Sequence, residues 1–254
     1  MRYTIFMFPP SRIVCLTEET VETLYLLGED ARIVGVSGYA VRPPQVRKEK
    51  PRVSAFISAD VPKILALEPD LVLTFSDLQA DIVADLIRAN VAVHAFNQRD
   101  LAGIFDMIRT LGALVGQPQN GDMLARTFEG RLELVRAWGK ALPRHPRVYF
   151  EEWDEPMISG IRWVSELIEA AGGIDVFPDL SQRKNARDRI VSPEAVIAAR
   201  PGFAAIPAVA SGWLREIKST IILQPGPAAL TDGLDALVQI VAEWVENQPP
   251  SMLG

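Results

Sequence analysis

Cysteine and histidine are scarce in this chain of 254 residues, and each scarcity argues against a class of function. Cys15 is the only cysteine, so the chain can form neither an internal disulfide nor a cysteine metal cluster. Its apolar surroundings, residues 12–16, predict a buried and inert thiol rather than a nucleophile. The two histidines, His94 and His145, fall in different halves of the chain, which disfavours a histidine metal centre. One imidazole that reaches a metal carried by a ligand stays open as an alternative.

The chain also lacks long runs of basic residues and long runs of apolar residues. No Lys/Arg run exceeds two residues, and the net charge is −6 with a pI near 5.1. A nucleic-acid partner is therefore disfavoured, because it requires a basic stripe. No apolar run approaches the roughly 18 residues of a membrane span, so we expect no membrane insertion. No G-x-S-x-G, Walker or G-x-G-x-x-G sequence appears, which gives no motif-based reason to expect an enzyme.

The first residues, MRYTIFMF, carry one basic residue and only a short apolar run before Pro9-Pro10. This run is too short for the core of a signal peptide, and no small-residue cleavage site follows. We therefore expect a cytoplasmic location if Met1 is the true start, and a periplasmic location if a leader precedes it. Residues 3–8 themselves predict an edge strand that ends at the prolines.

The residues that are present predict an α/β fold, with two Rossmann-like lobes of parallel sheets bridged by one long α-helix. The predicted bridge is Asn120–Leu142, whose apolar residues recur every three or four positions. We divide the chain into a first lobe (1–118), the helix (119–142) and a second lobe (143–254). A stiff helix between two lobes implies a cleft. An ordinary surface helix of one larger domain is the alternative.

The first lobe alternates strands and helices at the spacing of parallel βαβ units. The expected strands are Ile13–Leu16, Ile33–Val36, Val53–Phe56, Leu71–Phe75 and Val91–Phe96. The expected helices begin after Thr17, at Asp60, at Asp81 and at Leu101, and Val41–Pro51 is expected to be a surface loop.

Three aromatic residues lie at, or within three residues after, the ends of three of these strands. They are Tyr39, Phe56 and Phe75. Ligands of open parallel sheets lie beyond the carboxyl ends of the strands, so we expect these rings to line a shared apolar mouth. Such a mouth suits a large, flat and partly apolar ligand. Core packing is the alternative for any one of them.

The second lobe restarts with an expected strand at Arg147–Phe150. Trp153 then follows that strand as the three aromatics follow theirs, and Trp163 is a second candidate ligand contact. Trp213 is either a rim or a packing residue. We further expect a polar loop from Gly173 to Arg189, a helix capped by Ser192, a strand region at Leu214–Leu223 and a final helix at Gly233–Glu246.

The acidic run after the Arg147–Phe150 strand is the one group that could serve acid/base chemistry or bind a hard cation. It consists of Glu151, Glu152, Asp154 and Glu155. A run of acids on a loop is usually a solvated rim, so we predict neither catalytic nor metal-binding residues here.

Several stretches together resemble a known family. They are Arg12–Leu16, Glu22–Gly28, Ile33–Ser37, Pro43-Pro44, Ile64–Val72, Ala170–Gly173 and Arg189–Val196. They are similar to the periplasmic-binding-protein family that delivers cobalamin and ferric siderophores to ABC importers, and most similar to its cobalamin-binding branch. The resemblance implies two α/β lobes joined by one long helix. It also implies ligand contacts at Tyr39, Phe56, Phe75 and Trp153.

The chain departs from that family in three places. The resemblance implies an export or lipoprotein leader, which the first residues of this sequence do not lead us to expect. The resemblance implies docking on an ABC permease through one glutamate per lobe, and Glu194 matches the second, whereas Pro62 stands at the first and Asp60 is the nearest acid. The strand expected in the second lobe is replaced by the proline-interrupted residues 199–207.

We therefore expect a non-catalytic substrate-binding protein that holds cobalamin or a related corrinoid, with no cofactor of its own. A ferric-siderophore or haem-type chelate is one alternative ligand. A cytoplasmic α/β enzyme or sensor that reuses the scaffold is the alternative from another class.

Overall fold

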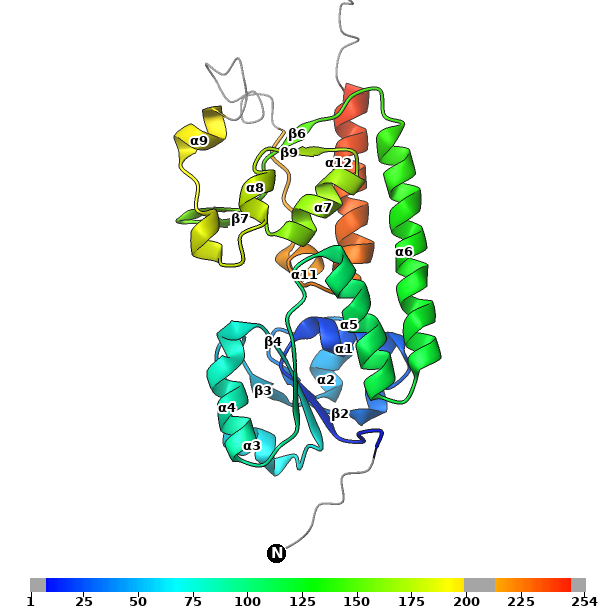
Figure 1. Cartoon of the computed structure of the whole chain (residues 1–254), viewed down its shortest axis with the longest axis vertical. Coiled ribbons are helices and arrows are strands. Elements are labelled where there is room, and N and C mark those ends of the chain that lie inside the picture. The colour runs from blue at the N-terminus through cyan, green and yellow to red at the C-terminus, as the bar shows by residue number, and fades with distance from the viewer. Residues whose placement is uncertain (1–7, 199–212, 248–254) are drawn as a thin grey trace, which may run out of the picture. The chain divides into compact units, whose positions relative to one another are not determined.

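The computed structural model describes residues 8–198 and 213–247, and the chain divides into two compact units (Figure 1). Unit 1 comprises Met1–Gln98 and Ala102–Phe128, and unit 2 comprises Arg99–Leu101 and Glu129–Gly254. Two expectations lie outside the described residues: most of the strand at residues 3–8 and the proline-interrupted segment at residues 199–207.

Unit 1 is organised around a sheet of five parallel strands in the order β3-β2-β1-β4-β5. The strands are β1 (Ile13–Cys15), β2 (Ile33–Ser37), β3 (Arg52–Ser54), β4 (Leu71–Phe75) and β5 (Val93–Phe96). The five predicted strands are confirmed, with small shifts at their ends. The chain runs outward from β1 to β3 and then returns to the other side of β1, so the strand order reverses between β1 and β4.

Helices cover both faces of this sheet (Figure 1). The helical segments of this part of the chain are α1 (Glu18–Leu26), η1 (Asp30–Arg32), α2 (Val46–Glu49), α3 (Val61–Ala66), η2 (Asp77–Gln79), α4 (Ala80–Arg88) and α5 (Leu101–Leu114). Val14 and Val72 point to one face, where they pack with Ile64 of α3 and Leu86 of α4. On the other face α1 meets α5, where the Thr23 hydroxyl lies 4.0 Å from the sulfur of Met107.

Two details of unit 1 differ from expectation. The segment expected to be a loop, Val41–Pro51, contains the short helix α2, whose Glu49 accepts a hydrogen bond from the Tyr25 hydroxyl at 2.8 Å. Thr17 does occupy the cap position of α1, but its side chain makes no capping bond, because its hydroxyl pairs with that of Thr20 at 3.1 Å. The Asp60 carboxylate, by contrast, caps α3 by accepting from the Lys63 amide at 3.0 Å.

The long amphipathic helix is confirmed as α6, Pro118–Lys140, with 23 residues. It begins two residues earlier than predicted, because proline is favoured in a first helical turn, where its missing N–H has no partner to lose. It also ends before Leu142. Phe128 and Leu132 of its apolar stripe are buried. The helix starts in unit 1 and ends in unit 2.

Unit 2 has more helix than strand in its described part. Its strands are β6 (Arg147–Val148), β7 (Glu151–Asp154), β8 (Met157–Ser159) and β9 (Ile174–Asp175). Its helices are α7 (Arg162–Ala170), α8 (Pro178–Ser181), η3 (Ala186–Arg189), α9 (Pro193–Ala198), α11 (Ser219–Ile222), η4 (Ala229–Gly233) and α12 (Leu234–Asn247). β6 and β9 form a parallel pair and β7 and β8 an antiparallel hairpin, so the parallel sheet expected here is reduced to two strands in the described residues.

Three expectations for unit 2 are wrong. The acidic run of Glu151, Glu152, Asp154 and Glu155 is not a loop, because most of it is strand β7, paired with β8. The stretch expected as a polar loop, Gly173–Arg189, contains β9, α8 and η3. The region Leu214–Leu223 contains the short helix α11 and no strand, although every residue of it is described.

The β7–β8 hairpin is held by the buried side chain of Arg189 from η3. Its guanidinium donates to both carboxylate oxygens of Glu152, at 2.6 and 3.1 Å, and also to the carbonyl of Ser159. The Ser159 hydroxyl donates in return to the Arg189 carbonyl at 3.1 Å. The Glu152 carboxylate is therefore used to stabilise the hairpin. The other acids of this run, Glu151, Asp154 and Glu155, are exposed.

Candidate functional site

The five parallel strands of unit 1 end at one edge of the sheet, which we call the carboxyl edge. Ligands of open α/β sheets bind beyond this edge, at the point where the strand order reverses. In unit 1 that point lies between β1 and β4. The segments that start there are residues 16–19 after β1 and residues 76–79 after β4.

Four apolar side chains follow the strands at this edge, and we call them the apolar rim. They are Tyr39 after β2, Phe56 and Ile57 after β3, and Leu78 after β4. Tyr39, Ile57 and Leu78 expose 58%, 70% and 59% of their surface, and Phe56 is half-buried. Exposed apolar side chains gathered at one place mark an interaction surface.

The sequence pointed to Tyr39 and Phe56 but missed Ile57 and Leu78. Both follow a strand end closely, so position along the chain alone could have marked them. An aliphatic residue at such a place carries no signal of its own in the sequence, because aliphatic side chains are also the commonest core residues.

Two of the predicted contacts are buried instead. Phe75 is the last residue of β4 and is packed in the sheet, with its amide donating to the Gln79 side chain at 3.0 Å. Trp163 lies in the core of unit 2, where its indole N–H donates to the carbonyl of Ile222 at 2.9 Å. Burial with a satisfied N–H is typical of a packing residue. Their roles as ligand contacts therefore stay predictions, and neither residue is part of the apolar rim.

Trp153 of unit 2 is exposed on strand β7, and its indole N–H donates to the carbonyl of Glu155 at 3.0 Å. This bond holds the ring within the hairpin and leaves its faces open. Trp213 is half-buried and stacks with the guanidinium of Arg215, 4.7 Å from the ring centroid. Trp153 therefore has a surface available to a ligand, and its predicted role stays a prediction.

Two buried carboxyl groups lie at the carboxyl edge, in the first turn of α1. Glu18 accepts a hydrogen bond from the Ser37 hydroxyl at 2.9 Å, and the same hydroxyl accepts from the Tyr39 amide at 3.2 Å. Burial raises the pKa of Glu18. Burial, and then repulsion from Glu18, raises the pKa of Glu19 to about 8. Both of these buried carboxyl groups therefore hold their protons to a higher pH than a freely exposed glutamate does.

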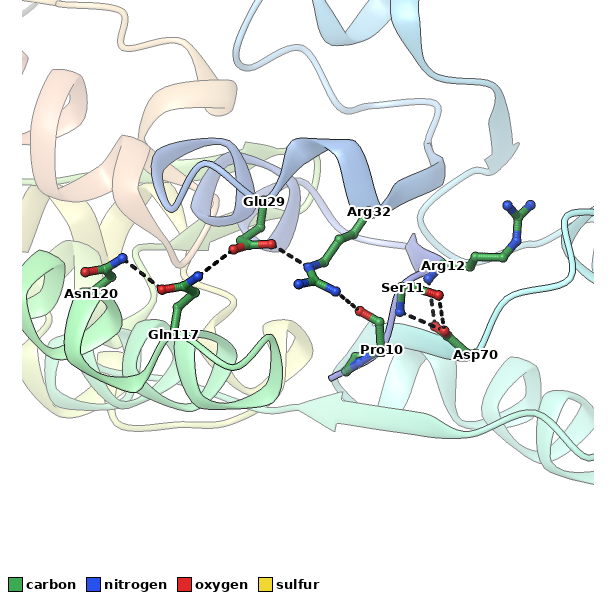
Figure 2. A network of polar contacts seen from close by, with 8 residues as sticks. All are labelled: Pro10, Ser11, Arg12, Glu29, Arg32, Asp70, Gln117 and Asn120. Atoms are coloured by element: carbon green, nitrogen blue, oxygen red, sulfur yellow. Dashed lines mark hydrogen bonds and ion pairs between the residues drawn. The ribbon is translucent and has the colours of Figure 1, made fainter. Parts of the chain in front are cut away.

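The opposite edge of the sheet is closed by polar contacts (Figure 2). Asp70, before β4, accepts from the amides of Ser11 and Arg12 at 2.7 and 2.8 Å. Arg32, before β2, donates to the carbonyl of Pro10 at 2.6 Å. Further along, Gln117 donates to Glu29 at 3.0 Å. The two edges therefore differ in character. At the opposite edge the polar groups are hydrogen-bonded to one another, whereas the carboxyl edge presents exposed apolar side chains.

The histidines do not join the candidate site. His94 in β5 packs its ring against Phe96, with centroids 4.4 Å apart, and partial burial lowers its pKa. His145 is exposed and its Nδ1 lies 2.9 Å from the carbonyl of Gly172. Among the described residues, no three His, Cys, Asp or Glu side chains converge on a point that could hold a metal ion.

The residues predicted to dock on a permease are both exposed. Asp60 caps α3, and Pro62 lies in the first turn of that helix. Glu194 lies in the first turn of α9, where hydrogen bonds from its own backbone and from Ser192 lower its pKa. Glu194 is thus a fixed negative charge on unit 2. None of the helices in residues 8–198 and 213–247 has the length and apolar character that crossing a membrane requires.

Several known proteins are similar to this chain in sequence or in fold. The vitamin B12-binding protein of Vibrio cholerae serotype O1 is 29% identical over 176 residues, which are 68% of this chain and 63% of that protein. The chain thus spans less than two thirds of that relative's length.

Two solved structures have a similar fold. The periplasmic vitamin B12 binding protein BtuF of Vibrio cholerae gives a TM-score of 0.74 at 24% identity, covering 94% of this chain and 99% of that one. The periplasmic heme-binding protein RhuT from Roseiflexus sp. RS-1 gives 0.76 at 25% identity, covering 91% and 99%.

The sequence model of the family described as periplasmic binding protein matches residues 13–201, well over half of the chain. This span contains the five-stranded sheet, the apolar rim and α6. The chain therefore belongs to the periplasmic binding protein family.

Proposed function

We propose that this chain is a non-catalytic substrate-binding protein of an ABC importer and that its ligand is cobalamin or a related corrinoid. The ligand would contact the apolar rim at the carboxyl edge of unit 1. The observation that carries the proposal is the rim itself, in a chain whose relatives include a vitamin B12-binding protein.

The chemistry of the rim suits a ligand with broad apolar faces. Three aliphatic or aromatic side chains can be covered there without displacing a bonded group, and each buried apolar Å² contributes about 25 cal/mol. The Tyr39 hydroxyl can donate a hydrogen bond to an amide carbonyl of the ligand. Affinity would thus come from burial and stacking rather than from coordination by the protein.

A haem-type chelate is the second candidate. It is favoured by the similarity to the RhuT fold and by the same apolar rim, which would cover a porphyrin face as well as a corrin face. A ferric-siderophore chelate is grouped with haem here, because both are metal chelates and form one alternative to a corrinoid ligand.

Titration of the purified protein with cobalamin tests the proposal, followed by the visible spectrum of the corrin and by calorimetry. We expect saturable one-to-one binding with a dissociation constant in the micromolar range or below. Hemin is titrated in parallel. Saturation by hemin but not by cobalamin would move the function to the second candidate. No binding of either at about 100 μM, an affinity weaker than roughly −5.5 kcal/mol, would contradict both.

A further inference from the structure

Gln79 is a polar side chain with no exposed surface at the carboxyl edge of unit 1. It is the last residue of η2, directly after Leu78 of the apolar rim. A buried amide must be hydrogen-bonded, because an unsatisfied one costs about 1–3 kcal/mol. The hydrogen-bond partners of Gln79 therefore show which backbone segments its side chain joins.

Three hydrogen bonds join Gln79 to three different strand ends. Its Oε1 accepts from the amide of Phe75, at the end of β4, at 3.0 Å. Its Nε2 donates to the carbonyl of Leu16, after β1, at 3.2 Å, and to the carbonyl of Phe56, after β3, at 2.8 Å. Two carbonyl partners on one side and one amide partner on the other define the orientation of the side-chain amide.

The backbone before Gln79 is shaped for this contact. Ser76 has a φ of +64°, a left-handed conformation that is uncommon for residues other than glycine. Its hydroxyl accepts from the Leu78 amide at 3.3 Å. This turn places Leu78 outward and Gln79 inward, so the exposed rim residue and the buried amide lie on opposite sides of one short segment.

The segment that carries Phe56 and Ile57 is a tight loop of its own. The Ala55 amide donates to the Ser58 carbonyl at 2.8 Å, and the Asp60 amide donates to the Val53 carbonyl at 2.9 Å. These bonds close the loop, and the bond from Gln79 to the Phe56 carbonyl anchors its middle to the point where the strand order reverses.

We propose that Gln79 is the positioning residue of the ligand site, which holds Phe56, Ile57 and Leu78 of the apolar rim in place through its three hydrogen bonds to the ends of β1, β3 and β4. This inference rests on the proposed function, because it assigns Gln79 a role in the same site. Gln79 acts through the backbone and touches no ligand itself. The rim is thereby arranged before a ligand arrives, which favours affinity, since less loop entropy is lost on binding.

The first test is Gln79→Met, which keeps the volume of the side chain and removes the three hydrogen bonds. We expect the dissociation constant for cobalamin to rise about tenfold or more, the equivalent of one lost hydrogen bond. We also expect faster hydrogen exchange of the Ala55 and Asp60 amides, measured by NMR or mass spectrometry without ligand. Circular dichroism checks that the variant is folded.

Gln117→Met is the matched control. Gln117 belongs to the polar network at the opposite edge of the same sheet, where it donates to Glu29 and accepts from Asn120 at 3.0 Å (Figure 2). We expect this control to lower stability while the cobalamin affinity and the exchange of the Ala55 and Asp60 amides stay as in the wild type.

Gln79→Glu provides a second variant that does not depend on the methionine variant folding. Its carboxylate accepts from the Phe75 amide but repels the carbonyls of Leu16 and Phe56, whereas its protonated form can donate to one of them. Affinity and amide protection should therefore recover as pH falls. The wild type, titrated in parallel, accounts for the neighbouring Glu18, Glu19 and Asp77.

The outcomes separate this inference from the proposed function. Exchange is measured without ligand, so it reports on Gln79 even if the wild type binds neither cobalamin nor hemin, a result that would count against the proposed function alone. Unchanged exchange in both Gln79 variants overturns the inference. Faster exchange with unchanged cobalamin affinity also overturns it, because Gln79 would then be only a structural residue.

Discussion

Glu19, in the first turn of α1, exposes 2% of its surface, and burial raises the pKa of its carboxyl group to about 8. In the unfolded chain the pKa of the same group is close to its ordinary value of 4.5. The folded state thus retains the proton to a higher pH than the unfolded chain. Stability associated with Glu19 is fully present below pH 4.5 and is lost as pH rises through 8.

We therefore expect Glu19→Gln to make the free energy of unfolding less dependent on pH. At pH 5 the variant should resemble the wild type, and at pH 9 it should be more stable by more than about 1 kcal/mol. Urea unfolding across that range measures this. Glu133→Gln, an exposed carboxylate on α6, is the control. A wild-type profile that is already flat between pH 5 and pH 9 would contradict the assignment.

Arg189 supports a second prediction at the residue scale. Its buried guanidinium is paired in a bidentate manner with Glu152, whose side chain is 21% exposed, and also donates to the Ser159 carbonyl. Removing Arg189 takes the partner from this carboxylate and from this carbonyl, and opens a cavity in the hairpin. We expect Arg189→Ala to lower the free energy of unfolding by about 3 kcal/mol. Arg187→Ala, two residues away with 82% of its side chain exposed, should cost less than about 0.5 kcal/mol. Equal effects of the two would show that the Arg189–Glu152 pair does not hold the hairpin.

At the scale of elements, α6 carries two glycines with opposite surroundings. A Cβ on Gly139 would lie 2.6 Å from the carbonyl oxygen of Ala170, at the end of α7, whereas a Cβ on Gly130 would have no atom within 4 Å. Gly139 thus permits a close approach of two backbones in unit 2, and Gly130 has no such role.

We expect Gly139→Ala to destabilise the protein by about 1–3 kcal/mol, because the backbone of α7 must move away. Gly130→Ala should instead stabilise it by up to about 1 kcal/mol through helix propensity alone. Thermal and urea unfolding of both variants measures the difference. Two changes of the same sign would contradict the packing described for α6.

The helix α6 also shows what periodicity can predict. Its apolar stripe and length followed from the sequence, because a 3.6-residue repeat is a local property of the chain. The short strands β7 and β9 did not follow from it. Strands of two to four residues contain too few positions to show a repeat, and their pairing depends on partners distant in sequence.

At the scale of the whole molecule, the exposure of the apolar rim leads to a prediction about ligand binding. We expect Ile57→Ala to raise the dissociation constant for cobalamin several-fold, because most of this side chain is exposed and available for burial by the ligand. Leu134→Ala on α6, with 75% of the side chain exposed, is the matched control and should leave the affinity unchanged. Calorimetry measures both. Equal effects would show that the rim has no special role.

Trp153 gives a parallel prediction from unit 2. We expect Trp153→Ala to weaken cobalamin binding and Trp163→Phe, a change in the core, to affect stability instead, since it removes the hydrogen bond to the Ile222 carbonyl. The visible titration and an unfolding curve separate the two effects. Normal affinity in the Trp153 variant would remove it from the set of predicted contacts.

The sequence alone determined the family, the class of fold, the central sheet of unit 1 and the long helix. These depend on local features: strand-length apolar runs, a helical repeat, and residue types at particular spacings. The tertiary structure decided which candidate side chains are available. Tyr39, Phe75, Trp153 and Trp163 look alike in the sequence, yet two are exposed and two are buried, because exposure depends on what the rest of the chain packs against each ring. The role of Gln79 was hidden for the same reason, since its three partners meet only when the ends of β1, β3 and β4 are brought together.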